Sequence, residues 1–211
     1  MTLSSLDVLI ASRSLLQHPF YLKWSKGELT LEDLRVYAKE YYHLVERVPG
    51  IVARVRDRVR DPQAAAFIEE NLREEQEHVE LWERFANSLG ISKQELKAYK
   101  PSMIVRAAIT DLEKTAEQGA DEGIACMYAL ELELPKIAKT KKDGLCAFYG
   151  LTSPDAHVYF DEHMGEEKHL AVWRTFDVAP DRAQAAAETS LTAQHRVLDA
   201  VCTLRGISMN C

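Results

Sequence analysis

The sequence has few of the residues that interrupt regular structure or cross-link a chain. Its 211 residues include nine Gly and seven Pro, and these stand mostly where a helix would begin or end. Segments with the alternating pattern of a half-buried strand are nearly absent. The four cysteines show no Cys-x-x-Cys spacing, which argues against a zinc knuckle or a dense disulfide framework. We expect Cys126 and Cys202 to be thiols that fill the core. A disulfide between Cys202 and Cys211 could form only as a cross-link of the C-terminal tail.

Long hydrophobic runs and a basic surface are also lacking. No apolar stretch reaches the ~20 residues of a membrane span, and residues 1–10 have neither a cationic head nor a cleavage site. Acidic residues outnumber basic ones by 33 to 26, giving a formal net charge of -7 without the basic stripe that phosphate binding requires. We therefore expect a cytoplasmic protein that binds neither nucleic acid nor membrane.

What the sequence does have is helical periodicity with clear start positions. Capping residues followed by apolar residues at three- and four-residue spacing predict about seven helices with short connections. The predicted starts are Thr30, Asp61, Ser92, Pro101, Asp121, Ser153 and Pro180, with Asp121 to Lys142 as one helix and Pro49-Gly50 as a point where a helix could kink. With 46% hydrophobic residues, the chain is expected to form one all-α domain, residues 1–211, with a core of about 14–204.

Two Glu-x-x-His units carry the main chemical information. Residues three apart lie about 60° apart around a helix, so each unit can direct a carboxylate and an imidazole at one point. Two such units on two helices of a bundle, joined by further inward carboxylates, are the ligand pattern of di-iron and di-manganese sites. The units are Glu75 with His78 and Glu166 with His169. One unit alone would be weak, because Glu and His are common on exposed helix faces, but two units among seven His are a stronger indication.

Three further residues extend this predicted metal site. His163 precedes Glu166 by three residues, so His163, Glu166 and His169 would span an arc of about 120°. That arc suits two neighbouring metals or a locally unwound helix. A bulge of one residue in this helix would direct Glu167, instead of Glu166, at the metal. Glu131 stands in an otherwise apolar stretch, where a buried carboxylate needs a partner such as a metal; the alternative is that the helix turns it to solvent.

The predicted ligands indicate the chemistry of the metal. Mixed imidazole and carboxylate ligation suits iron or manganese better than a structural zinc site, so we expect redox work with dioxygen. Tyrosines near an oxidising centre are candidate radical carriers or targets, although packing in the core is the simpler account of any single one. Those on the surrounding helices are Tyr21, Tyr37, Tyr41, Tyr42, Tyr128 and Tyr159.

A lysine-rich stretch follows Glu131 on the same predicted helix. Lysines near the end of a helix commonly complement its dipole, and this accounts for most of them. Lys141 differs because it lies ten residues after Glu131, close to three helical turns, and therefore on roughly the same face.

The chain is similar over most of its length to a known superfamily. The segments that carry the similarity are HPFYLKWSKGEL at 18–29, YAKEYY at 37–42, Leu81-Trp82, LPKIA at 134–138 and YFDEH at 159–163. From about Ser14 to Leu198 the sequence resembles the heme-oxygenase-like proteins that include thiaminase II and pyrroloquinoline-quinone synthase C. It resembles most the chlamydial proteins associating with death domains (CADD) and their bacterial relatives. The resemblance implies a heme-oxygenase-like helical bundle.

For function, the resemblance implies a dimetal oxidase that makes p-aminobenzoate for folate biosynthesis from its own side chains. Tyr21 matches the tyrosine that supplies the ring, Lys141 matches the lysine that supplies the amino group, and Tyr37 and Tyr159 match other tyrosines of the site. Two divalent metals, Fe, Mn or one of each, would act with dioxygen and an external reductant and without an external organic substrate. A homodimer is compatible with the superfamily. The matched ligands are Glu75, His78, Glu131, His163, Glu166 or Glu167, and His169.

Three departures from the CADD pattern bear on these expectations. The first Glu and His of that pattern are about one helical turn further apart than Glu75 and His78. The later unit is one residue shorter here and has Glu in place of Asp, so Glu166 and Glu167 both remain open. Leu130 stands where CADD has a tyrosine beside the site, which removes one radical carrier. Binding to death domains is not carried over.

Four alternatives remain open. A dimetal oxidase of the same fold could act on an external small amine or amino acid, with Tyr21 and Lys141 as pocket residues. A ferritin-like bundle would take Glu46 as a ligand and dispense with His163. An enzyme like pyrroloquinoline-quinone synthase or thiaminase II would need no metal, and thiaminase chemistry would need a nucleophilic thiol, for which Cys126 is the near candidate. A pure interaction protein would leave a buried cluster of ionisable groups unexplained.

Overall fold

The computed structural model describes residues 2–165 and 167–209, and side chains for the same ranges without 167–169. No β-strand occurs in the described ranges, where Thr2 and Asp177 form an isolated antiparallel bridge. The all-α prediction is confirmed. The elements are η1 Leu3–Leu6, α1 Asp7–Ser12, η2 Leu15–Gln17, α2 Pro19–Trp24, α3 Leu31–Arg56, α4 Pro62–Ser88, α5 Lys93–Ala98, α6 Met103–Gln118, α7 Ala120–Glu131, α8 Leu134–Phe148, α9 Pro154–Met164, α10 Glu167–Arg174 and α11 Pro180–Arg205.

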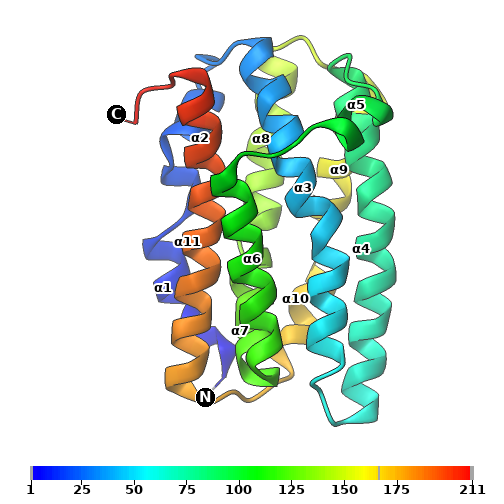
Figure 1. Cartoon of the computed structure of the whole chain (residues 1–211), viewed down its shortest axis with the longest axis vertical. Helices are drawn as coiled ribbons and strands as arrows, with labels where there is room; N and C mark the ends of the chain where they lie inside the picture. The colour runs from blue at the N-terminus through cyan, green and yellow to red at the C-terminus, as the bar shows by residue number, and fades with distance from the viewer. Residues whose placement is uncertain (1, 166, 210–211) are drawn as a thin grey trace.

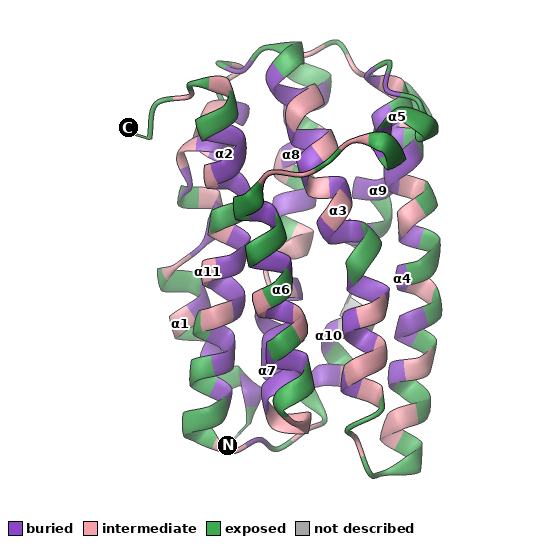
Figure 2. Cartoon of the chain, in the orientation of Figure 1, coloured by how far each residue is buried: buried purple, intermediate pink, exposed green. Residues whose placement is uncertain are grey.

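Three long helices, α3, α4 and α11, run along the long axis of the molecule (Figure 1). α11 packs mainly against α6 and α7, α3 packs against α4 and α6, and α9 contacts both α4 and α8. Buried and exposed residues alternate around each long helix, as expected for helices that bury one face (Figure 2). Within the described residues, no helix is both long enough and apolar enough to cross a membrane.

The buried side chains form two hydrophobic clusters. One combines the second half of α3 and the start of α4 with α6, α7 and most of α11, and the other combines α2, the first half of α3 and the end of α4 with α8 and α9. Tyr41 packs against both clusters and so marks the seam between them. Cys126 belongs to the first and Cys202 to the second, at 0% and 1% exposure, which confirms that both are core residues.

Most predicted helix starts are confirmed by the capping contacts that fix them. The side chains of Thr30, Asp61, Ser102 and Ser153 accept hydrogen bonds from backbone N–H groups in the first turn of α3, α4, α6 and α9. Gly206 ends α11 at φ 63°, a left-handed conformation that glycine adopts without strain.

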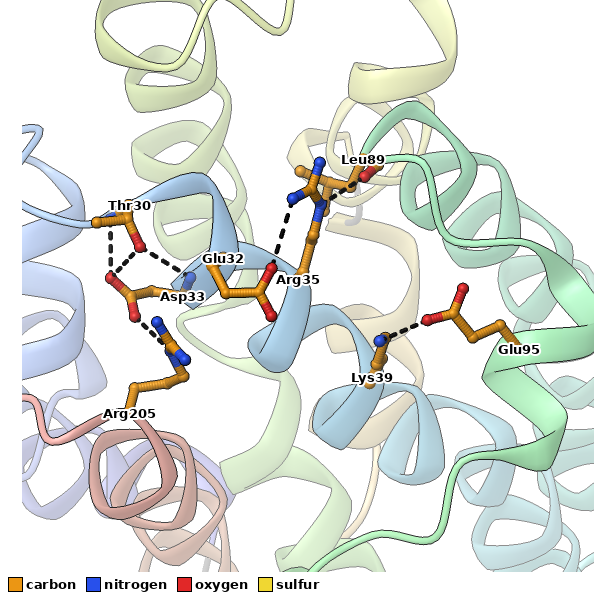
Figure 3. Close-up of polar contacts among 8 residues, drawn as sticks. All are labelled: Thr30, Glu32, Asp33, Arg35, Lys39, Leu89, Glu95 and Arg205. Carbon is orange, nitrogen blue, oxygen red and sulfur yellow. Dashed lines mark hydrogen bonds and ion pairs between the residues drawn. The ribbon is translucent and has the colours of Figure 1, made fainter.

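The first half of α3 is held by contacts with three other parts of the chain (Figure 3). Thr30 and Asp33 form a capping box, and Arg205 of α11 donates to Asp33 at 2.7 Å. Arg35 donates to the Leu89 carbonyl at 2.9 Å, after the end of α4. Lys39, further along α3, pairs with Glu95 of α5 at 2.6 Å. These contacts fix the rotation of α3 about its axis, and thereby the direction of the tyrosines that it carries.

Two predicted helices are each divided into two. The segment from Asp121 to Lys142 is α7 and α8, because Pro135 has no N–H to donate to the Glu131 carbonyl and its ring would clash there in a continuous helix. The prediction that Glu131 and Lys141 share one helix face is therefore wrong. The segment from Ser153 divides at Gly165 into α9 and α10. These breaks and the short N-terminal elements explain why the described residues form more helices than the seven predicted.

Candidate functional site

Carboxylates and imidazoles from three helices converge inside the bundle. Glu75 and His78 on α4 are 6% and 3% exposed, Glu131 at the end of α7 is 3% exposed, and His163 on α9 is 1% exposed. Glu75, Glu131 and His163 line one cavity of about 30 Å³. The rings of His78 and His163 lie 4.4 Å apart between centroids. The structure thus brings these four predicted ligands together and confirms that Glu131 faces inward.

Hydrogen bonds orient these groups. The Nδ1–H of His163 donates to the Tyr159 carbonyl at 2.6 Å, so in the neutral ring it is Nε2 that carries the lone pair. His78 Nδ1 lies 3.3 Å from a Glu75 carboxylate oxygen. Trp173 of α10 donates its indole N–H to the other carboxylate, Glu131, at 2.8 Å. Contacts of this kind are what fix the direction of a metal ligand in its site.

The donor set fits a pair of iron or manganese ions by its chemistry, because it consists of buried imidazoles and carboxylates without thiolates. Among the side chains that the structure describes, no group of three or more His, Cys, Asp or Glu is arranged to hold a metal ion. Glu166 lies outside the described residues, as do the side chains of Glu167 and His169. The backbone of α10, which carries Glu167 and His169, packs against α4 and α7.

Lys141 lies in a closed aromatic cage next to this cluster. Its side chain is 1% exposed, and its Nζ is 4.8 to 5.1 Å from three tyrosine ring centroids, those of Tyr21, Tyr37 and Tyr41. The rings of Trp82 and Phe160 complete the cage at 5.9 and 5.6 Å. Lys141 donates a hydrogen bond to the Tyr37 hydroxyl.

The neighbouring lysines differ sharply from Lys141. Lys139 pairs with Asp143 at 2.6 Å and Lys142 with Asp161 at 2.5 Å, both at the surface of α8. The burial of Lys141 lowers its pKa to about 7, because desolvation disfavours the charged ammonium. A large share of the molecules therefore carries an uncharged amine at this position near neutral pH.

Tyr21 enters the cage from a short helix that is fixed at its start. His18 accepts a hydrogen bond from the Phe20 N–H at 3.2 Å through Nδ1, which caps α2. The opposite ring nitrogen of His18 lies 3.1 Å from the carboxylate of Asp199 on α11. The hydroxyls of Tyr21 and Tyr37 lie 3.4 Å apart. Burial raises the pKa of both phenols well above the usual value, so both stay protonated.

Aromatic rings connect this cage with the buried imidazoles. Tyr37 lies 5.2 Å from Tyr41 between ring centroids, Tyr41 stacks on Trp82 at 4.9 Å, and Trp82 meets Tyr159 edge-on at 4.7 Å. Tyr159 in turn lies 4.1 Å from the ring of His163. Tyr21 joins this chain through the ring of Phe20, which lies 5.7 Å from Tyr21 and 5.0 Å from Tyr37, so four of the six predicted tyrosines belong to it.

The remaining two tyrosines face elsewhere. Tyr42 donates to Glu83 at 3.3 Å, and Tyr128 donates to Asp7 at 2.6 Å. Five of the six predicted tyrosines lie on predicted helices, whereas Tyr21 lies on α2, which the helical pattern did not predict. Only the fold decides which side of each helix faces the site.

Two of the alternatives conflict with the structure. Glu46, the ligand that a ferritin-like site requires, is exposed on α3. Burial raises the pKa of the Cys126 thiol to about 12, which keeps it protonated and unsuited to act as a nucleophile. Leu130 lines the 30 Å³ cavity, in agreement with the expected position beside the site.

Sequence reasoning missed three residues near the site. Trp173 contacts Glu131 across 42 positions of sequence, and nothing local indicates such a contact. Trp82 was recognised only as part of a family segment, although its ring forms part of the lysine cage. Asn71 lies four residues before Glu75, so helical spacing could have placed it on the ligand face.

The fold and the site define a heme-oxygenase-like helical protein with buried carboxylates and imidazoles. A domain of unknown function with this fold from Shewanella denitrificans superposes with a TM-score of 0.81 at 19% identity, covering 98% of this chain and 94% of that one. A CADD-like protein of unknown function from Nostoc punctiforme gives a TM-score of 0.74 at 18% identity, with coverages of 97% and 96%. These likenesses establish the fold.

The model of the TENA/THI-4/PQQC family matches residues 7–203, and the chain belongs to this family. It is 37% identical over 166 residues to a 4-aminobenzoate synthase of Chlamydia muridarum, covering 76% of this chain and 70% of that protein. It is also 31% identical to a 4-aminobenzoate synthase of Nitrosomonas europaea, covering 92% of this chain and 85% of that one. The resemblance seen in the sequence is confirmed.

Proposed function

We propose that this protein is a 4-aminobenzoate (p-aminobenzoate) synthase, an oxygen-dependent dimetal oxidase that builds its product from Tyr21 and Lys141 of its own chain. The observation that carries the proposal is the enclosed contact between the Lys141 amine and the Tyr21 ring, 5.1 Å from Nζ to the ring centroid. Because the pKa of Lys141 is lowered to about 7, this contact brings a neutral amine against a phenol ring in a site closed to water. The names of the relatives support the same product.

The metal pair would be held by Glu75, His78, Glu131 and His163, together with the predicted ligands Glu166 or Glu167 and His169. When bound, iron or manganese would supply the activation of dioxygen, with electrons from an external reductant. The protein supplies the positions: the Tyr159 carbonyl sets the tautomer of His163, and Trp173 holds Glu131.

The aromatic cage would hold the two reacting side chains, Tyr21 and Lys141, together. It excludes water from Lys141, and the Tyr37 hydroxyl holds the Lys141 amine in place beside Tyr21. Ring contacts run from Tyr37 through Tyr41 and Trp82 to Tyr159. This continuity means that Tyr21 need not touch a metal ligand in order to be oxidised.

The test uses protein labelled with ring-¹³C tyrosine and ε-¹⁵N lysine. The purified chain is stripped of metal, loaded anaerobically with Fe(II) and Mn(II), and given dioxygen and reductant without any organic substrate. Mass spectrometry should detect 4-aminobenzoate that carries both labels, in at most stoichiometric amount. A peptide map should show matching loss at Tyr21 and change at Lys141.

Conservative variants separate the sacrificed residues from their neighbours. Tyr21→Phe and Lys141→Arg should abolish labelled product, whereas the matched controls Tyr42→Phe and Lys142→Arg should retain it. If metal binds and dioxygen is consumed but no labelled product forms, the self-sacrificing function is wrong. An oxidase acting on an external small amine or amino acid would then be the function to test.

A further inference from the structure

The segment that precedes α2 is held along one face of α11. The Arg13 guanidinium donates to the Thr192 hydroxyl at 3.1 Å, and the Nε2–H of His195 donates to the Arg13 carbonyl at 2.9 Å. Nε2 of His18 lies 3.1 Å from the Asp199 carboxylate. Positions 192, 195 and 199 are three and four residues apart, so they share one face of the helix. These contacts fix the start of α2 beside the C-terminal half of α11 (Figure 1).

Two hydrogen bonds define the protonation state of His18. Its Nδ1 accepts the hydrogen bond from the Phe20 N–H at 3.2 Å, so Nδ1 carries a lone pair. The proton of the neutral ring is then on Nε2, which donates to Asp199. A second proton, on Nδ1, would set two donors against each other and remove the cap of α2. His18 can therefore cap α2 only as a neutral imidazole.

The surroundings of His18 favour this neutral state. The residue is 3% exposed, and burial lowers its pKa below the ordinary value of 6.5, because desolvation disfavours the imidazolium. Two titratable groups of α11 face it: the Asp199 carboxylate favours the imidazolium, and His195, 5.6 Å away between ring centroids, disfavours it. Below pH 6.5 the unfolded chain binds a proton that the capped chain does not, so the capped state loses stability as the pH falls.

Tyr21 depends on this cap for its direction. It follows His18 by three positions on a helix of six residues, which is too short to be stable by itself. The ring of Tyr21 lies 5.1 Å from Lys141 between its centroid and Nζ, and its hydroxyl lies 3.4 Å from that of Tyr37. A change in the first turn of α2 would therefore move the ring relative to the lysine.

We infer that His18 is a positioning residue for Tyr21: the neutral imidazole, oriented by Asp199, caps α2 and thereby directs the Tyr21 ring at the Lys141 amine. His18 acts through the backbone of α2 and takes no part in the reaction itself. This inference rests on the proposed function for the importance of Tyr21. It adds to that function a dependence on pH that begins outside the metal-ligand cluster.

The test follows Tyr21 by NMR in the full-length, metal-free protein labelled with ring-¹³C tyrosine. The Tyr21 signal is assigned by its loss in Tyr21→Phe, and spectra are recorded from about pH 8 to about pH 5. We expect the signal to leave its native position in one transition below about pH 6.5. The midpoint should equal that of the His18 ring, measured in protein labelled with ¹³C histidine. A Tyr21 signal that does not move as His18 titrates would overturn the inference.

Variants assign the transition to His18. His18→Asn retains a side-chain acceptor for the first turn and cannot titrate, so Tyr21 should keep its native signal throughout. His18→Leu cannot cap and should displace the signal at every pH. Asp199→Asn should move the transition to lower pH, because it removes the charge that favours the imidazolium. The control is His157→Asn on α9, which should leave the transition unchanged.

One result in these variants would contradict the inference directly. A Tyr21 transition that persists in His18→Asn would show that another group is responsible. The wild-type titration and His18→Asn decide the question even if His18→Leu does not fold.

The positioning inference and the proposed function fail separately. The Tyr21 signal is measured without metal and dioxygen, whereas labelled 4-aminobenzoate requires both. The rate of product formation should fall about 10- to 100-fold in His18→Leu, because the ring is misplaced, and should be largely retained in His18→Asn. Product together with a Tyr21 signal that ignores His18 contradicts only the positioning inference. A Tyr21 signal governed by His18 without product contradicts only the proposed function.

Discussion

Burial changes what Lys141 can do. A lysine at the surface is a cation, but the aromatic cage lowers the pKa of Lys141 to about 7 and so favours the neutral amine. The same desolvation opposes folding at any pH at which Lys141 is protonated in the unfolded chain, because folding must then bury a charge or release the proton. The chemistry of the site and the stability of the fold are thus linked through one proton.

This linkage predicts a pH dependence of stability. Between the folded pKa of about 7 and the ordinary value of 10.5, the unfolded chain binds more protons than the folded chain, so the free energy of unfolding should rise with pH. The contribution of Lys141 should be up to about 1.4 kcal/mol per pH unit in this window. Urea denaturation at several pH values should therefore give a steeper positive slope for the wild type than for Lys141→Met. Lys142→Met is the control, since its pKa is raised by Asp161, and equal slopes for wild type and Lys141→Met would contradict the prediction.

Trp173 should act on metal binding through Glu131. Trp173→Phe removes the indole N–H that holds the Glu131 carboxylate at 2.8 Å while keeping an aromatic ring. We expect metal affinity to fall by about 10- to 100-fold, the range found for such supporting contacts. Anaerobic titration with Fe(II) or Mn(II) measures it.

The matched control for this variant is Trp24→Phe. Trp24 is also fully buried and donates its indole N–H, but to the backbone carbonyl of Lys141. Its loss should leave metal affinity unchanged. Equal losses in the two variants would show a general effect of tryptophan removal.

At the scale of single residues, the sequence predicted which ionisable residues belong to the site better than it predicted the residues that contact them. Glu75 and His78 were predictable from their Glu-x-x-His spacing on a helix, and Glu131 because a buried carboxylate in an apolar stretch requires a partner. Lys141 was distinguished from Lys142 only through the family resemblance and a helical spacing that the break before α8 invalidates. The contacts that give these residues their properties join distant helices and leave no local pattern.

At the scale of the elements, the close approach of α2 and α8 sets the distance between Tyr21 and Lys141. A Cβ added to Gly144 on α8 would meet the Trp24 indole of α2 at 2.6 Å, so only glycine allows this approach. The packing of α2 on α8 therefore depends on Gly144 having no side chain.

Gly144→Ala should force α2 away from α8. We expect a loss of about 1–3 kcal/mol in the free energy of unfolding, as for other overpacked cores, and a lower yield of labelled product. Gly50→Ala, inside α3, is the control: its Cβ meets only the guanidinium of Arg54, at 3.3 Å, so the free energy of unfolding should change by less than about 1 kcal/mol. Chemical denaturation of both variants measures the free energy of unfolding. Unchanged stability in Gly144→Ala would contradict the packing argument.

Helix starts were the most predictable feature of the elements, since capping residues act locally. Thr30, Asp61 and Ser153 each cap the helix that their pattern predicted. The break before α8 was not predicted, because Pro135 is compatible both with a kink and with the first turn of a new helix. Tertiary packing chooses between the two.

At the scale of the molecule, the candidate site lies at the seam between two hydrophobic clusters. Tyr41 packs on both clusters and lines the 30 Å³ cavity with Glu75 and Glu131. A metal pair at this seam would join α4, α7 and α9. Metal binding should therefore stabilise the whole bundle.

Anaerobic thermal unfolding with Mn(II) tests this. At a metal concentration 100 times the dissociation constant, stabilisation of about 2.7 kcal/mol should raise the melting temperature by roughly 5–10 °C for a chain of this size. Chelation should reverse the shift. Glu131→Gln and His163→Ala should lose it, whereas Glu46→Gln, on the exposed face of α3, should retain it. A shift that depends on Glu46 would restore the ferritin-like alternative.

Tyr21 is 2% exposed and packs in the core, and on the proposed function this burial has a consequence after the reaction. A chain that gives up its Tyr21 ring is left with a hole where an aromatic side chain was, which costs roughly 3–5 kcal/mol. That loss is a substantial part of the stability of a typical domain, about 5–15 kcal/mol. The spent chain would unfold more often and become a substrate for proteases, so product release and disposal of the used protein would be two results of one event.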